Sequence, residues 1–279
     1  MNIVQESSLE MAERYHTDGF LFPLEAVSAA TAADIRADLE AAELELADEP
    51  DKLALLRLYP DRLLPSFDAL IRNERLIAAA ASVLGEDLLV WSAALFTKEA
   101  NSPKIVSWHQ DLTYWGLKGT REVTCWVALT PSNAHNGAMK FMPGSHKAQL
   151  VPHNDTFAEN NLLSRGQEVA VEVDEADAVV VELEPGQFSM HHGYMFHSSG
   201  PNNSDERRIG SAIRFINAST SHDDGTKALV AHVNGEDRWN HFQIATSPKA
   251  RLSESDFELC AQDVMARNRI FYRGAENPL

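Results

Sequence analysis

The sequence contains little cysteine and no cluster of basic residues. Only Cys125 and Cys260 occur among the 279 residues, too few for a disulfide framework or a thiolate zinc site, so we expect a reducing, cytoplasmic location. Lysine and arginine number 24 against 41 acidic residues, which gives a net charge of -17. Such a chain would repel a phosphate backbone, so no nucleic-acid partner is expected.

Long hydrophobic runs are absent as well. Nowhere do about 18 apolar residues follow one another, the minimum for a membrane-spanning helix. The first 20 residues lack the basic start and apolar stretch of a secretion signal. We therefore expect a soluble, untargeted protein without a membrane partner.

Hydrophobic residues make up 44% of the chain, enough to bury the core of one large domain or two small ones. No internal repeat or low-complexity tract is visible, so a single domain over residues 1–279 is the economical interpretation. The oligomeric state stays open, and a homo-oligomer is compatible with the sequence.

The N-terminal part, about residues 1–87, has mostly helical patterns. Thr31 is a candidate N-cap for a helix. Apolar residues recur behind it at helical spacing, at Ile35, Leu39, Ala42 and Leu46. A second helix is predicted over 67–84, rich in Ala and Leu and ended by Gly85. Near the C-terminus, residues 253–270 predict a helix, part of a helical return over about 250–272.

Residues 88–220 have a different hydrophobic pattern, which predicts the strands of a sandwich or barrel. Short apolar or alternating runs are punctuated there by Pro, Gly and Asn. Within this part, residues 147–176 are acidic and weakly periodic, and longer than an ordinary connection between strands. That segment is either a lid over a site or a solvated surface excursion.

The segment SWHQD places His109 and Asp111 one residue apart. On a strand, alternation would send both side chains to the same face, with α-carbons about 6 to 7 Å apart, within reach of one metal ion. Alone, the pair is weak evidence, because among eleven histidines a surface hydrogen-bonded pair can arise by chance. A third ligand is required.

Three later histidines, His191, His192 and His197, are candidates for that ligand. Two histidines and a carboxylate on one face of a metal leave three positions open, as in non-haem Fe(II) oxygenases. The same set also suits zinc and hydrolysis. A carboxylate-bearing cosubstrate would need an arginine as well, since a guanidinium clamps a carboxylate with two parallel hydrogen bonds. Two arginines follow the last histidine.

Three segments carry a family resemblance: SWHQDLTYWGL, NGAMKFMPGSHK and FHSSGPNNSDERRIG. They resemble the phytanoyl-CoA dioxygenase family of Fe(II)/2-oxoglutarate-dependent oxygenases, and the likeness runs from YHTDGFLF to AIRFI, most of the chain. Three motifs in the right order are far more specific than one. The resemblance implies a mainly β protein with flanking α-helices, a double-stranded β-helix (a jelly-roll, cupin-like barrel) with helices packed outside. The order of helical and strand patterns agrees with this fold.

The resemblance also implies a ligand set and cosubstrate contacts. His109, Asp111 and His197 correspond to the catalytic metal ligands. The family's arginine for the distal carboxylate of 2-oxoglutarate lies eleven residues after the last histidine, which selects Arg208 over Arg207. An ion pair with a neighbouring acidic residue is the structural alternative for this arginine.

Further residues are expected beside the cosubstrate. The resemblance places Ser199 and Trp126 there, with Lys98 as a weaker match. Thr124 has the same strand parity as Trp126 and is expected to face the same cavity. An aromatic residue in an apolar strand is core by default, so Trp126 can be both core and cavity wall.

The activity implied is oxidative decarboxylation of 2-oxoglutarate with O2 to succinate and CO2, coupled by Fe(II) to hydroxylation of an unactivated substrate C–H bond. Halogenases that resemble this pattern have a small residue in place of Asp111. Because this sequence keeps the carboxylate, oxygenation is the expected outcome.

Four residues are candidates for substrate contact. Arg214 shares strand parity with Arg208 and could receive an anionic group. Tyr114 and Trp115 follow the HxD pair and would suit an apolar body or a cationic group, or simply pack in the core. His192 precedes the last ligand and is a further candidate.

The substrate is expected to be a small polar metabolite. The compact chain resembles enzymes that oxidise the carbon beside the phosphonate of aminoethylphosphonate and of its N-methylated forms. Long-chain acyl-CoA fits less well, because a net charge of -17 offers little to a polyphosphate. A catalytically idle metal-binding or sensory barrel is the rival interpretation.

Overall fold

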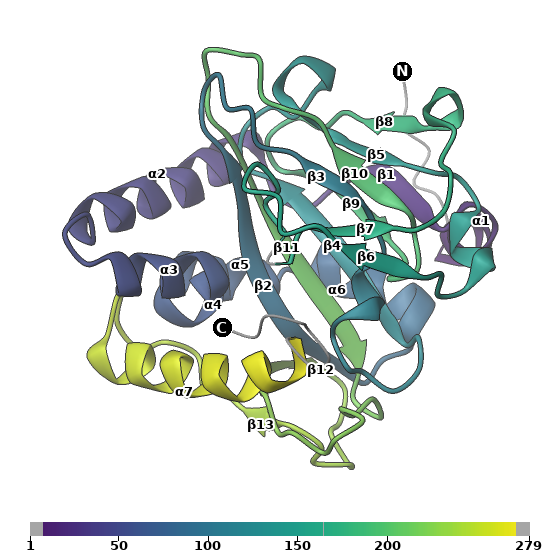
Figure 1. Ribbon diagram of the computed structural model, residues 1–279. Coiled ribbons are helices and arrows are strands. Elements are labelled where there is room, and N and C mark those ends of the chain that lie inside the picture. The colour runs from purple at the N-terminus through teal and green to yellow at the C-terminus, as the bar shows by residue number, and fades with distance from the viewer. Residues whose placement is uncertain (1–7, 164, 272–279) are drawn as a thin grey trace.

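The computed structural model describes residues 8–163 and 165–271, and most of its helices precede its strands (Figure 1). The helices are α1 (Ser8–Asp18), α2 (Ala29–Glu45), α3 (Pro50–Leu58), α4 (Pro60–Leu63), α5 (Pro65–Ile71), α6 (Glu74–Leu84) and α7 (Glu254–Phe271). The strands are β1 (Phe20–Glu25), β2 (Leu88–Lys98), β3 (Val106–His109), β4 (Glu122–Ala128), β5 (Met139–Phe141), β6 (His153–Asp155), β7 (Gln167–Val169), β8 (Val179–Val181), β9 (Gln187–His191), β10 (His197–Ser199), β11 (Arg208–Asn217), β12 (Leu229–Asn234) and β13 (Gln243–Ile244).

Two sheets form the body of the protein. The larger has seven strands in the order β1-β9-β4-β11-β2-β12-β13, and the smaller has four in the order β3-β10-β5-β8. Their facing residues form one buried cluster, which includes Trp126 and Ala212 from the large sheet and Met139, Phe141 and Val181 from the small one. The two sheets therefore pack face to face. The large sheet extends beyond the barrel core expected at 88–220, because β1 joins one edge and β12 and β13 the other.

Strand alternation divides the side chains of the large sheet between two environments. On β4, Val123, Cys125 and Val127 belong to the core beneath the helices, whereas Trp126 and Ala128 belong to the cluster between the sheets. A period of two residues sends alternate side chains to opposite faces. The face between the sheets is the one that carries the polar residues described below.

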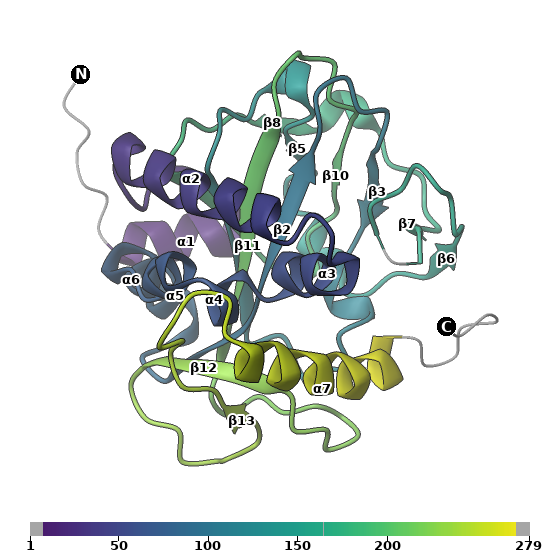
Figure 2. The same ribbon diagram turned by 90° about the vertical axis from the view of Figure 1, so that its left-hand side faces the viewer.

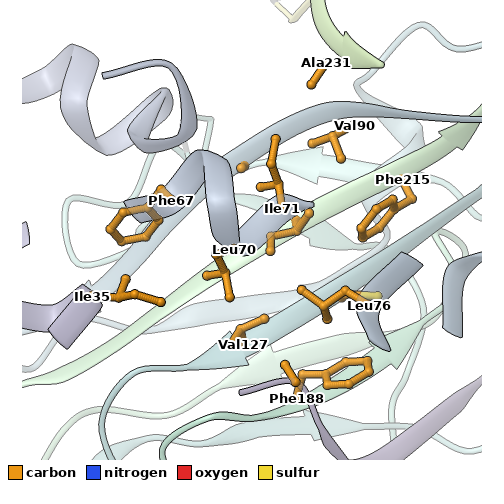
Figure 3. Packing of buried hydrophobic residues seen from close by; sticks show 14 of the residues in the cluster. Ile35, Phe67, Leu70, Ile71, Leu76, Val90, Val127, Phe188, Phe215 and Ala231 are labelled. Atoms are coloured by element: carbon orange, nitrogen blue, oxygen red, sulfur yellow. The ribbon is translucent and has the colours of Figure 1, made fainter. Parts of the chain in front are cut away.

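The helices cover the outer face of the large sheet, and Figure 2 views the molecule from that side, with α2 and α3 in front of β2 and β11. Figure 3 shows the packing: Phe67 and Ile71 of α5 and Leu76 of α6 lie over the sheet near Phe215. Each such fully buried side chain contributes about 1.5–3 kcal/mol relative to exposure. The helices thus hold the sheet from one side and leave the other side free for a site.

Two details of the helices differ from the sequence predictions. Ser28, not Thr31, caps α2, since its Oγ accepts a hydrogen bond from the Thr31 amide at 3.1 Å. The predicted helix over 67–84 is two helices, because the Asn73 side chain accepts hydrogen bonds from the amides of Arg75 and Leu76 and so starts α6 afresh. The predicted apolar face of α2 is confirmed, with Ile35, Leu39, Ala42 and Leu46 all buried.

The C-terminal helix and the candidate lid are both present as structure. The predicted helix at 253–270 is α7, and residue 272 of the expected return lies outside the described residues. Segment 147–176 contains the short hairpin β6–β7. Across the described ranges, no helix has the length and apolarity needed to cross a membrane.

Candidate active site

Three ligand-type side chains meet at the edge of the small sheet. His109 ends β3, and His197 begins β10 and lies opposite His109 in the antiparallel pairing. The strand considered for SWHQD does not reach Asp111, because β3 stops at His109 and Asp111 opens a 3₁₀ turn. The side chains of His109 and Asp111 nevertheless converge, and their ligand atoms and that of His197 lie within 4.8 Å of one another.

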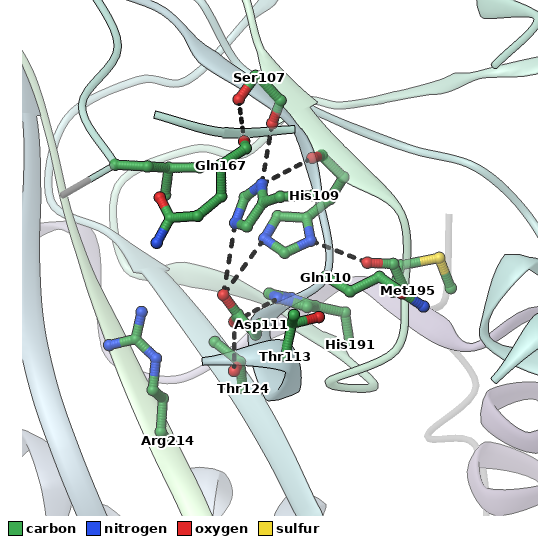
Figure 4. A network of polar contacts seen from close by, with 12 residues as sticks. Ser107, His109, Gln110, Asp111, Thr113, Thr124, Gln167, His191, Met195 and Arg214 are labelled. Carbon is green, nitrogen blue, oxygen red and sulfur yellow. Dashed lines mark hydrogen bonds and ion pairs between the residues drawn. The ribbon is translucent and has the colours of Figure 1, made fainter. Parts of the chain in front are cut away.

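Backbone carbonyls orient both histidine rings (Figure 4). His109 Nδ1 lies 2.9 Å from the carbonyl of Ser107 and 3.1 Å from that of His197. His197 Nδ1 lies 3.0 Å from the carbonyl of Met195. Since a carbonyl only accepts, each Nδ1 carries a hydrogen, and Nε2 is the ring nitrogen that faces Asp111, at 3.4 Å for His109 and 3.9 Å for His197. This is the tautomer that binds a metal.

The protonation states also suit a metal. Burial, and next the charge of His109, lower the pKa of His197 well below that of an ordinary histidine. Burial alone would raise the pKa of Asp111, but interactions with His109, His191 and His197 bring it well below its usual range. Metal ligands must be deprotonated, so a neutral imidazole beside a carboxylate is ready to bind a cation.

Three buried polar side chains, Thr124, His191 and Glu122, lie around the outer oxygen of Asp111, and of these the sequence analysis missed Glu122. Thr124 Oγ1 lies 3.4 Å from Asp111 Oδ2 and donates to Glu122 Oε1 at 2.8 Å. His191 Nε2 lies 3.8 Å from the same Asp111 oxygen, and neither ring nitrogen of His191 has a hydrogen-bond partner. Burial and then the charge of Asp111 raise the pKa of Glu122 well above its usual range. The sequence analysis named His191 only as a candidate for the third metal ligand, and the structure places it beside the outer oxygen of Asp111.

A narrow cavity, which we call the inner cavity, runs from the three ligand-type side chains into the space between the sheets. It is lined by Phe96, Val106, His109, Asp111, Thr124, Trp126, Met139, His191, His197, Ser198, Ser199, Arg208, Ala212 and Arg214. The cavity therefore brings together four of the five residues expected beside the cosubstrate. Lys98, the fifth, reaches this group through Ser199, to whose Oγ its Nζ donates at 2.6 Å.

Two basic side chains are buried at this cavity: Arg208 lines it, and Lys98 lies behind the lining residue Ser199. Arg208 and Lys98 are each 1% exposed. The Arg208 guanidinium donates to the carbonyl of Gly137 at 2.8 Å and lies over the Trp126 ring, while its Nε has no partner. Burial lowers the pKa of Arg208 to about 10, and burial together with Arg208 lowers that of Lys98 to about 7. Two buried like charges of this kind are costly unless an anion joins them.

Arg207 lies in a different environment. Its guanidinium forms ion pairs with Glu43 and Glu99 on the outside of the sheet. Alternation along the chain at the start of β11 thus separates the two arginines, one to the surface and one to the cavity. Of the two, only Arg208 lines the cavity.

A larger cavity of about 340 Å³, which we call the outer cavity, opens on the other side of the three ligand-type side chains. Its lining includes His109 and Asp111, aromatic residues and residues of the candidate lid: Leu58, Tyr59, Trp91, Ser92, Ala94, Phe96, Gln110, Tyr114, Trp115, Leu162, Leu163, Gln167, Arg214, Val264, Arg267, Asn268 and Phe271. The volume lies at the lower end of the range typical of ligand pockets. This cavity has room for a substrate beside the metal ligands.

Three of the four expected substrate contacts line that cavity. Arg214 Nη1 donates to Ser92 Oγ at 3.1 Å, and the guanidinium lies 4.8 Å from the centre of the Trp115 ring. Tyr114 lines the same wall. His192 is the exception: its ring lies near Tyr15 and His146 on the opposite face of β9, because adjacent strand residues alternate. We therefore withdraw His192 as a substrate contact.

Two facing sheets with a cluster of two histidines and one carboxylate beside a cavity lined by a buried arginine form the arrangement typical of a mononuclear metal site on a jelly-roll. The family described as phytanoyl-CoA dioxygenase (PhyH) matches residues 15–210. The chain belongs to this family, and the resemblance seen in its three motifs is confirmed.

Curated relatives match part of the chain. A probable alpha-ketoglutarate-dependent hypophosphite dioxygenase of Stutzerimonas stutzeri is 28% identical over 153 residues, 53% of this chain and 52% of the relative. An ectoine dioxygenase of Stutzerimonas stutzeri (strain A1501) is 32% identical over 153 residues, 50% of each chain. The match thus spans about half the length of these relatives.

Solved structures match over almost the whole chain. The non-heme monooxygenase ThoJ, in its apo form, has a TM-score of 0.85 and 33% identity over 94% of this chain and 98% of its own. CytC3 with Fe(II) and alpha-ketoglutarate has a TM-score of 0.67 at 19% identity, over 85% of this chain and 93% of its own, and supports the fold alone. The predicted double-stranded β-helix with flanking helices is confirmed.

Proposed function

We propose that the protein is an Fe(II)- and 2-oxoglutarate-dependent dioxygenase that hydroxylates a C–H bond of a small polar metabolite, releasing succinate and CO2. One observation carries the proposal: the His109, Asp111 and His197 cluster opens onto a cavity lined by the buried Arg208, and the buried Lys98 donates to Ser199 in the wall of the same cavity. A metal alone would not require these cations, whereas a chelating dicarboxylate would. The names of the relatives, alpha-ketoglutarate-dependent and non-heme oxygenases, support it.

The donor set fits Fe(II). Two neutral imidazoles and one carboxylate on one face are the protein ligands typical of non-haem Fe(II) oxygenases. His109, Asp111 and His197 would hold the ion, and its three open positions would supply the chemistry of O2 activation when it is bound. Thr124 and His191 would act indirectly, through their positions beside the outer oxygen of Asp111, and Glu122 would orient the Thr124 hydroxyl.

The inner cavity fits 2-oxoglutarate. The proposal gives Arg208 the distal carboxylate, with Lys98 adding charge through its contact with Ser199. Trp126 would hold the arginine from one side, since the guanidinium lies 5.1 Å from its ring centre. Thr124 lines the wall near Asp111. A dianion would offset the charge that burial makes costly in the ligand-free protein.

Arg214 supports an anionic substrate. It is buried beside Asp111, its Nε has no partner, and its guanidinium stacks on Trp115. A carboxylate or phosphonate bound there would set a neighbouring carbon near the metal, and Tyr114 and Trp115 would contact the rest of the molecule. Aminoalkylphosphonates are one candidate class, and the named substrates of two relatives are ectoine and hypophosphite.

Other properties remain part of the proposal. A single domain over residues 1–279 agrees with the continuous core shared by helices and sheet. Both cysteines are buried and free, as suits the proposed cytoplasmic location. We propose segment 147–176 as a lid because Leu162 and Leu163 line the outer cavity.

The alternatives differ in one feature. A zinc hydrolase or an idle metal-binding barrel would use the three ligands but would not need Lys98 and Arg208. The free-energy cost of burying these two basic side chains would then not be offset by a bound anion. An acyl-CoA hydroxylase would need basic residues for a polyphosphate, which a chain with a net charge of -17 offers poorly.

The test is an anaerobic titration of the protein with Fe(II) and 2-oxoglutarate, followed by the visible absorption of the chelate. O2 is then admitted with a panel of small oxyanions that includes aminophosphonates, and succinate is measured. We expect the band in wild type and in the control Arg207→Ala, and its loss in His197→Ala and Arg208→Ala. A band that persists in both loss variants would show that the site assignment is wrong.

A further inference from the structure

Gln167 lies on the opposite wall of the outer cavity from Arg214. It belongs to β7, inside segment 147–176, whereas Arg214 belongs to β11 of the large sheet. Both line the cavity that contains His109 and Asp111. Figure 4 shows the Gln167 amide and the Arg214 guanidinium directed into the same space beside Asp111. Neither motif spacing nor family resemblance pointed to Gln167.

The orientation of the Gln167 amide is fixed by its neighbours. Its Oε1 accepts a hydrogen bond from the backbone amide of Arg165 at 3.3 Å. The oxygen is therefore the end turned toward the hairpin, and the NH2 group is the end turned toward the cavity. Gln167 is 6% exposed, so this NH2 group is a buried donor that lies across from a buried guanidinium.

Several contacts hold Gln167 in place from the hairpin side. Ser107 Oγ donates to its backbone carbonyl, and Asn161 Nδ2 in turn donates to Ser107 Oγ at 2.7 Å. The preceding Arg165 donates to Asp155 Oδ2 at 2.9 Å and to the carbonyl of Phe271 at 3.0 Å. The side chain is thus presented by an ordered hairpin rather than by a free loop, which favours a defined binding geometry.

We propose that Arg214 and Gln167 form a two-sided clamp for an oxyanion on the substrate, a carboxylate or a phosphonate. The guanidinium supplies the charge and the amide supplies a second donor from the lid segment. Anion binding therefore adds a link between the hairpin and the large sheet to the contacts that already hold the hairpin to β3 and α7. The inference rests on the proposed oxygenase function and deepens it by naming the class of substrate group and a specificity residue.

The cavity also limits what carries the anion. Much of its wall beyond the clamp is aromatic or aliphatic, with Trp91, Trp115, Phe271, Leu162 and Leu163 present beside the polar residues Ser92, Gln110, Arg267 and Asn268. An oxyanion attached to an apolar or aromatic body would satisfy both parts. Phenylphosphonate and benzoate are suitable probes, and benzyl alcohol is the uncharged counterpart.

The experiment measures binding of these probes by calorimetry, with Co(II) and saturating 2-oxoglutarate present so that the inner cavity is filled. Wild type is compared with Arg214→Met and Gln167→Met, and Gln243→Met on the exposed strand β13 serves as the matched control. We expect Gln167→Met to weaken phenylphosphonate or benzoate by about 10-fold and Arg214→Met by more, since hydrogen bonds to charged groups are the strong ones. Benzyl alcohol affinity and the control should not change. The stronger of the two anionic probes identifies the group as phosphonate or carboxylate.

A second measurement tests the tie between the two elements. Hydrogen exchange of residues 147–176 should slow on addition of the stronger anionic probe in wild type and remain unchanged in Gln167→Met. Equal probe affinity in wild type and both variants would overturn the clamp, and so would the absence of anion binding to wild type. Affinity for 2-oxoglutarate, measured on the same samples, separates these results from a failure of the oxygenase assignment, because the clamp variants leave Arg208 intact.

Discussion

Replacing Lys98 by Met should stabilise the ligand-free protein and weaken its affinity for 2-oxoglutarate. Lys98 is 1% exposed, and burial together with the charge of Arg208 lowers its pKa to about 7. In an unfolded chain the amine titrates near 10.4. The difference between the two pKa values lowers the stability of the folded protein by about 5 kcal/mol when the amine is charged in both the folded and the unfolded state.

The loss depends on pH with a definite sign. Because the pKa is lower in the folded protein, the cost is complete below about pH 7, shrinks as the pH rises, and vanishes above about pH 10.4. The Lys98→Met variant does not have this cost. It also lacks the two hydrogen bonds that Lys98 donates to Ser199 Oγ and to the Gly200 carbonyl, and each of these contributes about 1 to 2 kcal/mol. We expect a net gain of about 2 kcal/mol near pH 7, or about 4 °C in Tm for a chain of this length.

Thermal unfolding between about pH 6 and pH 10, in the presence of a chelator, would measure this effect. The exposed Lys104 provides the matched control, Lys104→Met. The advantage of Lys98→Met should fade toward high pH, and calorimetry with Co(II) should find its 2-oxoglutarate affinity reduced at least about 10-fold. If the variant is less stable at every pH and binds 2-oxoglutarate like wild type, Lys98 has a structural role and the reasoning fails.

Three further predictions concern other parts of the chain. Arg208→Met should raise the Kd for 2-oxoglutarate at least about 30-fold, whereas Arg207→Met, which removes only surface ion pairs, should leave it unchanged in the same calorimetric titration. His191→Phe should weaken Co(II) binding by about 10- to 100-fold in competition with a chelator, and equal affinities would mean that Asp111 needs no such support. Asn73→Ala should lower the free energy of unfolding in urea by about 1 kcal/mol without changing 2-oxoglutarate affinity.

The sequence predicted those features that a local pattern encodes. The buried stripe of α2 follows from helical spacing, and strand parity alone put Thr124 beside Trp126. The ligand cluster was reached through spacing and motif resemblance together. The strand considered for SWHQD does not reach Asp111, but the 3₁₀ turn leaves its carboxylate beside His109, 3.4 Å from the ring.

Features that depend on contacts between distant segments could not be predicted. His191 and Glu122 are far apart in sequence and become neighbours of Asp111 only through the pairing of β4 with β9. Gln167 reaches the cavity because a hairpin folds back over it. The break at Asn73 is different, since an Asn followed by Glu is a local start signal that Ala-rich periodicity outweighed.

Strand β11 sets the distance between the two proposed anion sites. Arg208 and Arg214 both face the interior and lie six residues apart on it, about 20 Å along an extended strand. The interior positions between them are Gly210 and Ala212, and a Cβ at position 210 would collide with the Trp126 indole. Gly210 therefore leaves room for the indole against the strand, and one cavity touches both arginines and the three ligand-type residues. A slip of one residue in the register of β11 would turn both arginines into the apolar core beneath the helices, so the alternation that builds this core also fixes the spacing of the site.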